Sequence, residues 1–160
     1  MPSDTPSLIL AAELVPATSW YNNLRAVMSK EQWDHIRKEV YAHYGHRCAL
    51  CNASGTLHCY EIWKYDDTAL TQTLEGFVAL CPWCHHIKHL GYAGILASEG
   101  KLDYERLIRH FMAVNQCDRA EFLKHKDAAF DQWERRSKHR WKVDIGEYAE
   151  VCQKEPTRFS

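Results

Sequence analysis

Two Cys-x-x-Cys pairs constrain the fold of this chain more than any other feature of its sequence. The first pair is Cys48 and Cys51, and the second is Cys81 and Cys84. Each pair brings two thiolates to one turn, and four thiolates complete the tetrahedral coordination of structural zinc. The intervening residues 52–80 are longer than a usual zinc-ribbon spacer and leave room for two strands. The sequence therefore predicts one structural Zn²⁺ ion that joins two distant turns.

The remaining cysteines and the N-terminus bear on the cellular compartment. Cys59, Cys117 and Cys152 lie outside the pairs and make the total of seven odd. Secreted proteins usually pair their cysteines, whereas a reducing cytosol tolerates single thiols. The apolar run 8–12 has no preceding basic residue and is too short to span a membrane. We therefore expect a cytoplasmic protein without a membrane partner; a redox role for the cysteine pairs is an alternative that metal binding explains better.

The composition predicts one folded domain. A chain of 160 residues is about one domain long, and six Trp, eight Tyr and five Phe argue against disorder. The 20 Lys and Arg residues are balanced by 21 Asp and Glu residues, which gives a net charge of -1. The overall charge therefore does not attract nucleic acid, and a polyanion would have to bind a local patch.

We expect an α+β, mainly helical fold with a single domain over residues 20–150. Residues 1–19 contain three prolines and are expected to be loosely ordered, and residues 151–160 form a C-terminal tail. Within the domain, a zinc-bound core of two strands and a helix covers residues 46–92. A helical tail follows over residues 102–150.

Capping residues and apolar spacing predict the first half of the domain. The segment 20–27 forms either a short helix or an irregular docking segment. Ser29 and Gln32 form a capping box at the start of a helix that Gly45 ends. The aromatic and apolar segment 56–65 predicts a strand, and residues 66–76 link it irregularly to a second strand.

The second half of the domain is predicted in the same way. The second strand covers residues 77–80, and the following cysteine pair opens a helix that Gly91 closes. Asp103 and Asp118 each cap a further helix. In the last helix, four side chains are expected to face inward: Phe122, Leu123, Phe130 and Trp133. The segment 141–145 alternates like a short strand.

Histidines follow the second cysteine pair in the run His85-His86-Ile-Lys-His89. His85 and His89 are four residues apart, so a helix presents both on one face, where two imidazoles can share a metal ion. His86 projects about 100° away. The alternative is a polar helix face that carries ordinary histidines.

This order of elements resembles that of the HNH endonucleases of the ββα-metal type. The likeness depends on Cys48-x-x-Cys51, the strand LHCYEIW and the run LCPWCHHIKHLG. It extends to a group of bacterial and phage HNH-like proteins over roughly residues 13–150. The further shared residues are Leu14-Val15-Pro16, Trp20, Asn23, Arg25, Arg136-Ser137, Trp141 and Asp144-Ile145.

The resemblance implies a metal-dependent endonuclease that hydrolyses DNA phosphodiester bonds. His85 falls on the closing histidine of the motif, and His89 falls on an accessory ligand of some members. The strand pair that is often His-His, Asp-His or Glu-His falls on Tyr60-Glu61, and a tyrosine is a poor ligand for a hard divalent ion. His58 lies on the same strand face as Tyr60 and can take its place, or it is a cross-strand surface residue.

We therefore expect a second, catalytic divalent ion, Mg²⁺, Mn²⁺ or Zn²⁺, in addition to the structural zinc. His85 and His89 would bind it together with either His58 or Glu61. Whichever of His58 and Glu61 does not bind the ion would activate the attacking water.

Basic residues near the C-terminal end of the helical tail are candidate phosphate contacts. They lie beside Trp133 and Trp141, which are candidate base-stacking partners. This set is Arg135, Arg136, Lys138, Arg140 and Lys142, and Lys88, on the helix that follows the second cysteine pair, is the other candidate phosphate contact. The alternative is a solvated helix face with both tryptophans in the core.

A catalytically degenerate HNH-like module is the alternative to the endonuclease. Such a module keeps the zinc-stabilised scaffold and binds a protein partner, or DNA without cleavage. Tyr60, the nearly balanced charge and the long helical tail favour this alternative.

Overall fold

The computed structural model describes residues 7–19, 24 and 28–151. The segment predicted over residues 20–27, apart from Leu24, lies outside the described residues, as does the tail after residue 151. The fold is α+β, with five α-helices and one small sheet in the described part of the chain. Within these residues no helix is long and apolar enough to cross a membrane.

The sheet has three strands in the order β1-β2-β3. Strands β1 (His58–Asp66) and β2 (Thr71–Leu80) form an antiparallel hairpin, and β3 (Lys142–Asp144) pairs in parallel with β2. Strand β1 is therefore an edge strand. The short strand predicted over residues 141–145 is confirmed by β3.

The hairpin is longer than predicted, because β2 begins at Thr71 and not at residue 77. A tight turn replaces most of the expected irregular link. The Asp66 side chain accepts the backbone N–H groups of Thr68 and Ala69, and Leu70 adopts a left-handed φ of 55°. Gln72 and Leu74 then alternate inward, so this part of the strand buries one face.

Helix α2 (Lys30–His43) confirms the predicted capping box, in which the side chains of Ser29 and Gln32 each bond the other's backbone N–H. Gly45 follows the helix with a φ of 63°, a conformation that glycine adopts without strain. Asp103 and Asp118 cap α5 (Tyr104–Asn115) and α6 (Arg119–Arg136) as predicted.

The helix after the second cysteine pair differs from the prediction. It breaks at His89 into α3 (Pro82–Lys88) and α4 (Leu90–Ser98), and Gly91 lies inside the second helix and does not end the first. Leu90 and Ala93 are buried and hold α4 in the core. In α6, Phe122 is fully buried, but Leu123 is 47% exposed, contrary to the prediction.

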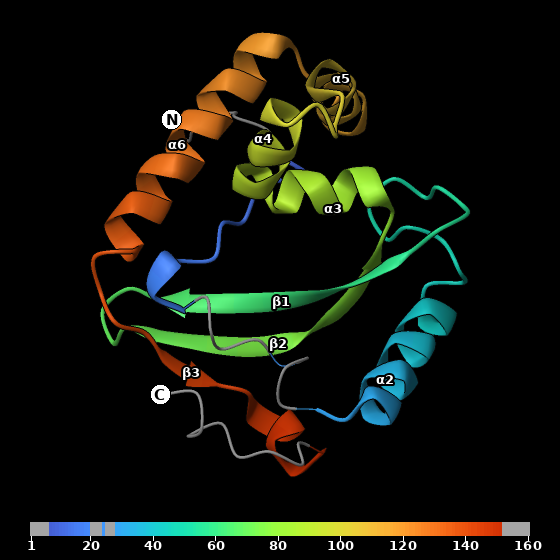
Figure 1. The fold of residues 1–160 in the computed structure, drawn as a ribbon, viewed down its shortest axis with the longest axis vertical. Helices are drawn as coiled ribbons and strands as arrows, with labels where there is room; N and C mark the ends of the chain where they lie inside the picture. Colours follow the sequence, from blue (N-terminus) through green and yellow to red (C-terminus); the bar gives the residue numbers. More distant parts are fainter. Residues whose placement is uncertain (1–6, 20–23, 25–27, 152–160) are drawn as a thin grey trace.

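The two faces of the hairpin are covered by different helices. Helices α3, α4, α5 and α6 lie over one face, and α2 lies against the other (Figure 1). Tyr60 and Ile62 of β1 pack in the cluster that contains α3 and α5. Cys59 and Trp63 pack in the second cluster with α2. The period of two along β1 therefore assigns alternate side chains to two separate cores.

Residues 7–19 pack into the molecule and are not a loose lead-in as expected. This segment runs between the upper helices and the sheet and ends in the short 3₁₀ helix η1 (Ala17–Ser19) (Figure 1). Leu10 is fully buried, and the Asn115 side chain bonds both its N–H and its C=O at 2.8 Å. The Ala12 N–H donates to His125 Nε2 at 2.9 Å. Side chains of distant helices thus form the hydrogen bonds of this extended backbone. No local sequence pattern reveals these contacts.

Asn115→Ala tests this attachment. The substitution leaves two backbone groups of Leu10 without partners, which is expected to lower the free energy of unfolding by about 1–3 kcal/mol in urea denaturation. Asn115→Asp keeps the acceptor for the Leu10 N–H but loses the donor, and should give an intermediate value. Equal stability of the alanine variant and the wild type would contradict this role.

Candidate metal centre and histidine cluster

The four cysteines of the two pairs meet at one point of the fold. Cys48 and Cys51 lie in the turn between α2 and β1, whereas Cys81 and Cys84 lie where β2 passes into α3. All four sulfur atoms lie within 4.8 Å of one another, and the Sγ atoms of Cys51 and Cys81 are 3.5 Å apart. Tetrahedral zinc with Zn–S bonds of about 2.3 Å requires sulfur atoms about 3.8 Å apart. The cluster can therefore hold a structural metal such as zinc.

Local backbone geometry positions these thiols. Cys81 is the N-cap of α3, and its Sγ accepts the Cys84 N–H at 3.4 Å. Asn52 adopts a left-handed φ of 64°, which closes the first turn, and its N–H donates to the Cys48 carbonyl at 2.9 Å. The Ala49 N–H bonds the Ala79 carbonyl at 2.9 Å and attaches this turn to β2.

The thiols influence one another's ionisation. Hydrogen bonds from Cys81 and Cys84 lower the pKa of Cys48, while the same contacts raise the pKa of Cys81 to about 11 and raise that of Cys84 further. His110, on α5, lies beside this cluster, with its Nε2 atom 3.2 Å from Cys84 Sγ. When that sulfur is a metal-bound thiolate, it accepts a hydrogen bond from the imidazole N–H. No sequence motif points to His110, which is distant in the chain from the four cysteines.

Three histidines gather beside the metal centre. The Nδ1 atoms of His58 on β1 and His85 on α3 are 2.7 Å apart, within hydrogen-bonding distance. The ring of His89 lies 4.9 Å from that of His85, and the Tyr60 ring contacts both. Burial and the neighbouring histidines lower the pKa of His85 to about 3, and burial lowers the pKa of His89. Both imidazoles are therefore neutral at pH 7, the form that binds metals.

These histidines do not form a ready-made metal site. Among the residues that the structure describes, only the cysteine cluster brings three or more candidate ligand atoms together within 4.8 Å. His58 and His85 are hydrogen-bonded to each other, and an ion between them would have to replace that bond. The histidines are thus suitable in chemistry for an ion but are not arranged around one.

Tyr60 belongs to a polar network that includes Glu13. The Tyr60 hydroxyl donates to Glu13 Oε2 at 2.8 Å, and Lys88 Nζ lies 3.0 Å from Glu13 Oε1. Burial and the nearby carboxylate raise the pKa of Tyr60, so its hydroxyl stays protonated. The Lys88 side chain is only 10% exposed. The Lys88 ammonium is therefore held in an ion pair with Glu13 and is little exposed to a phosphate.

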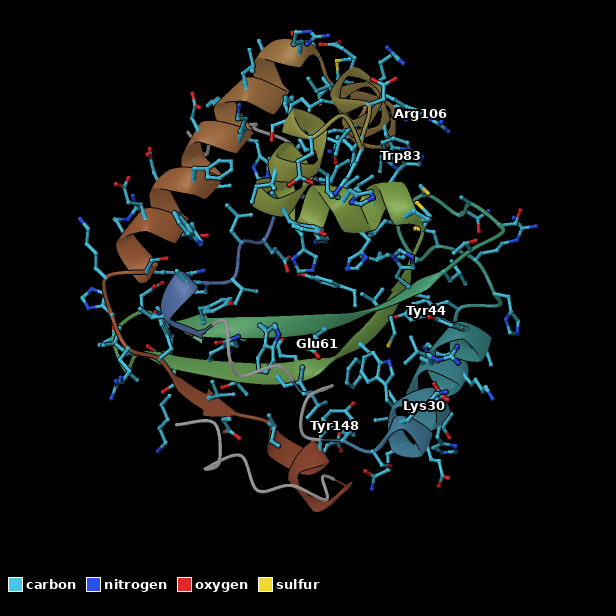
Figure 2. The ribbon with its side chains drawn as sticks, viewed as in Figure 1. Lys30, Tyr44, Glu61, Trp83, Arg106 and Tyr148 are labelled. Atoms are coloured by element: carbon cyan, nitrogen blue, oxygen red, sulfur yellow. The ribbon has the colours of Figure 1, made fainter. Side chains whose placement is uncertain are left out.

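Glu61 lies on the opposite face of β1 from the histidines. Its side chain is on the side of the strand that faces away from α3 (Figure 2), and its Oε2 accepts the Trp63 Nε1–H at 3.2 Å. Alternation along the strand places His58 and Tyr60 on the other face. Glu61 therefore does not join His85 and His89, contrary to one of the two sequence-based alternatives.

A cavity of about 720 Å³ opens beside the histidine pair. His58 and His85 contribute to its wall, and helix α2 supplies much of the remainder. The lining residues are Met28, Ser29, Lys30, Trp33, Asp34, Arg37, Tyr41, His58, Cys59 and His85. No sequence motif assigns a function to α2, whose polar face has the pattern of an ordinary solvated face.

The basic cluster at the end of α6 is only partly available to a ligand. Arg136 pairs with Asp67 through Nε and Nη2 at 2.9 and 3.0 Å, and its guanidinium lies over the Tyr65 ring. Trp141 is buried and donates to the Arg136 carbonyl, while Trp133 donates to the Val15 carbonyl. Both tryptophans thus have structural roles. The remaining candidates of this cluster are exposed: Arg135, Lys138, Arg140 and Lys142.

Removal of the metal should unfold the centre of the protein, because metal-binding free energy contributes directly to folding at such sites. Cys48→Ser is expected to reduce the zinc content by elemental analysis from one ion per chain to below one and to lower the melting temperature. Cys117→Ser, at a thiol outside the cluster, is the matched control and should change neither value. An unchanged melting temperature after complete removal of zinc would refute a structural metal.

The hydrogen bond from His110 should strengthen metal binding. We expect His110→Ala to weaken zinc affinity by about tenfold or more in competition with a chromophoric chelator, as is typical when such a supporting residue is lost. Arg109→Ala, at the exposed neighbouring position of α5, controls for changes to the helix itself. If both variants bound zinc as tightly as the wild type, His110 would have no such role.

No family model, curated protein or solved structure matches the chain.

Proposed function

We propose that this protein is an HNH-like, metal-dependent endonuclease that hydrolyses DNA phosphodiester bonds. The observation that carries the proposal is the contact between His58 and His85, at 2.7 Å, in the wall of a large cavity. One histidine comes from the first strand of a hairpin, and the other comes from the helix that follows the second strand. This is the order of elements on which the sequence resemblance depends.

The roles of the histidines follow from their positions. His85 would bind a divalent ion, with His89 beside it as the accessory ligand. When bound, such an ion polarises the phosphate and stabilises the leaving oxygen. His58 would accept the proton of the attacking water, because Glu61 lies on the other face of β1. Imidazole ligands suit Zn²⁺, whereas Mg²⁺ and Mn²⁺ prefer oxygen ligands, so Zn²⁺ is the ion that we expect His85 and His89 to bind most tightly.

Plasmid nicking with Mg²⁺, Mn²⁺ or Zn²⁺ tests the proposal. The wild type should nick in the presence of at least one of these ions, and His58→Ala should be about a hundredfold slower or worse, the usual contribution of a general base. His85→Ala should lose the nicking that depends on the added ion, because it removes a ligand of that ion. His35→Ala is the matched control, since His35 is 73% exposed on α2 and lies outside the cavity lining.

Zinc content and melting temperature separate a catalytic loss from misfolding. Variants that keep one structural zinc ion and the melting temperature of the wild type report on chemistry alone. Absence of metal-dependent nicking by the wild type would overturn the enzyme assignment.

A non-cleaving binding module is the second candidate, and the Tyr60–Glu13–Lys88 network favours it. The tyrosine hydroxyl and the lysine ammonium both bind one carboxylate beside His85 and His89. Tyr60 occupies the strand position at which the resemblance would place a metal ligand, and its hydroxyl is engaged with Glu13. One metal ion per chain, together with nucleic-acid or protein binding but no cleavage, would support the module, whereas two ions per chain would support the enzyme.

A further inference from the structure

Helix α2 presents one continuous face to the cavity beside the histidine pair. The contributing side chains are Lys30, Trp33, Asp34, Arg37 and Tyr41, which recur at the spacing of a single helix face. Lys30 marks the start of α2, and Tyr44 marks the opposite end of the helix (Figure 2). The cavity therefore extends along most of the helix, and His58 and His85 also line it.

The position of the cavity makes it accessible to an extended ligand. It lies by His58, the first residue of β1, which is the edge strand of the sheet. Helix α2 packs on one face of the hairpin and α3 on the other, so the two helices flank this end of the free edge (Figure 1). No further strand continues the sheet beyond β1 in the described part of the chain.

The lining combines cationic and aromatic groups. Lys30 and Arg37 are its cations, and Asp34 is its one carboxylate. The Asp34 carboxylate accepts the Arg37 Nε–H at 2.9 Å, and a guanidinium has four further N–H donors. The Tyr41 hydroxyl donates to the Leu57 carbonyl, which fixes the ring in the cavity wall. Cations beside aromatic rings are the usual means of binding an unpaired nucleic-acid strand.

We propose that this cavity binds a single DNA strand, with the strand's phosphates on Lys30 and Arg37 and a base against the aromatic wall. The inference deepens the proposed function and rests on it, since the strand would reach the His58–His85 pair. The volume of about 720 Å³ suits a ligand of nucleotide size rather than a duplex. The phosphate contacts thus come from α2 and not from the basic residues 135–142.

Fluorescence anisotropy with a labelled oligothymidylate, without added divalent ions, tests the inference. Lys30→Ala and Arg37→Ala should each weaken binding about threefold to tenfold. Each should also reduce the slope of log K against log salt by about 0.7, the value for one lost phosphate contact on a single strand. Asp34→Ala should strengthen binding, because it removes the carboxylate that competes for Arg37. A merely structural effect on α2 would weaken binding in all three variants.

Lys38→Ala and Arg140→Ala are the controls. Lys38 is an exposed cation of the same helix outside the lining, and Arg140 represents the C-terminal basic residues. Both variants should bind as the wild type does. The inference is overturned if Lys30→Ala and Arg37→Ala behave like Lys38→Ala, if Arg140→Ala causes the larger loss, or if a matched duplex binds more tightly than the strand.

The outcomes separate this inference from the endonuclease proposal. Strand binding that depends on Lys30 and Arg37, without any nicking, would overturn the enzyme and leave the strand-binding cavity established. If the protein nicks DNA but neither Lys30→Ala nor Arg37→Ala changes strand binding, the cavity assignment alone would be overturned.

Discussion

Four cysteine sulfurs that meet within 4.8 Å join the turn after α2 to the start of α3, and the rest of the structure depends on this junction. The hairpin between the two cysteine pairs has helices on both faces. Helices α2 and α3, one on each face, connect to the hairpin at the same end. Without that junction, a hairpin of this size would be only marginally stable in water. A metal ion there would replace part of the apolar core that a small sheet cannot supply.

The junction also brings the candidate functional groups together. Because α3 begins at the cysteine cluster, its first turn places His85 directly over His58 at the start of β1. Because α2 ends at the same cluster, its polar face closes the side of that space. The cysteine cluster, the imidazole pair and the cavity thus lie next to one another because α2 ends and α3 begins at the same four cysteines.

The N-terminal segment completes the opposite side of this region. Glu13 enters between β1 and α3 and binds both Tyr60 and Lys88. The little-exposed Lys88 ammonium requires such a partner, since an unpaired charge in the interior is costly. Every member of the network has a partner, so the network stabilises the arrangement. It also keeps Lys88 away from solvent and fills the space beside His85 and His89.

The sequence by itself determined the features that depend on nearby residues. Ser29 with Gln32, Asp103 and Asp118 began their helices as predicted, because a capping hydrogen bond joins residues three positions apart. The tertiary structure alone decided which distant charges form pairs. Glu13 meets Lys88, and Asp67 meets Arg136, across long stretches of chain. Such pairs leave no periodic pattern, since their energy depends on packing that only the complete fold provides.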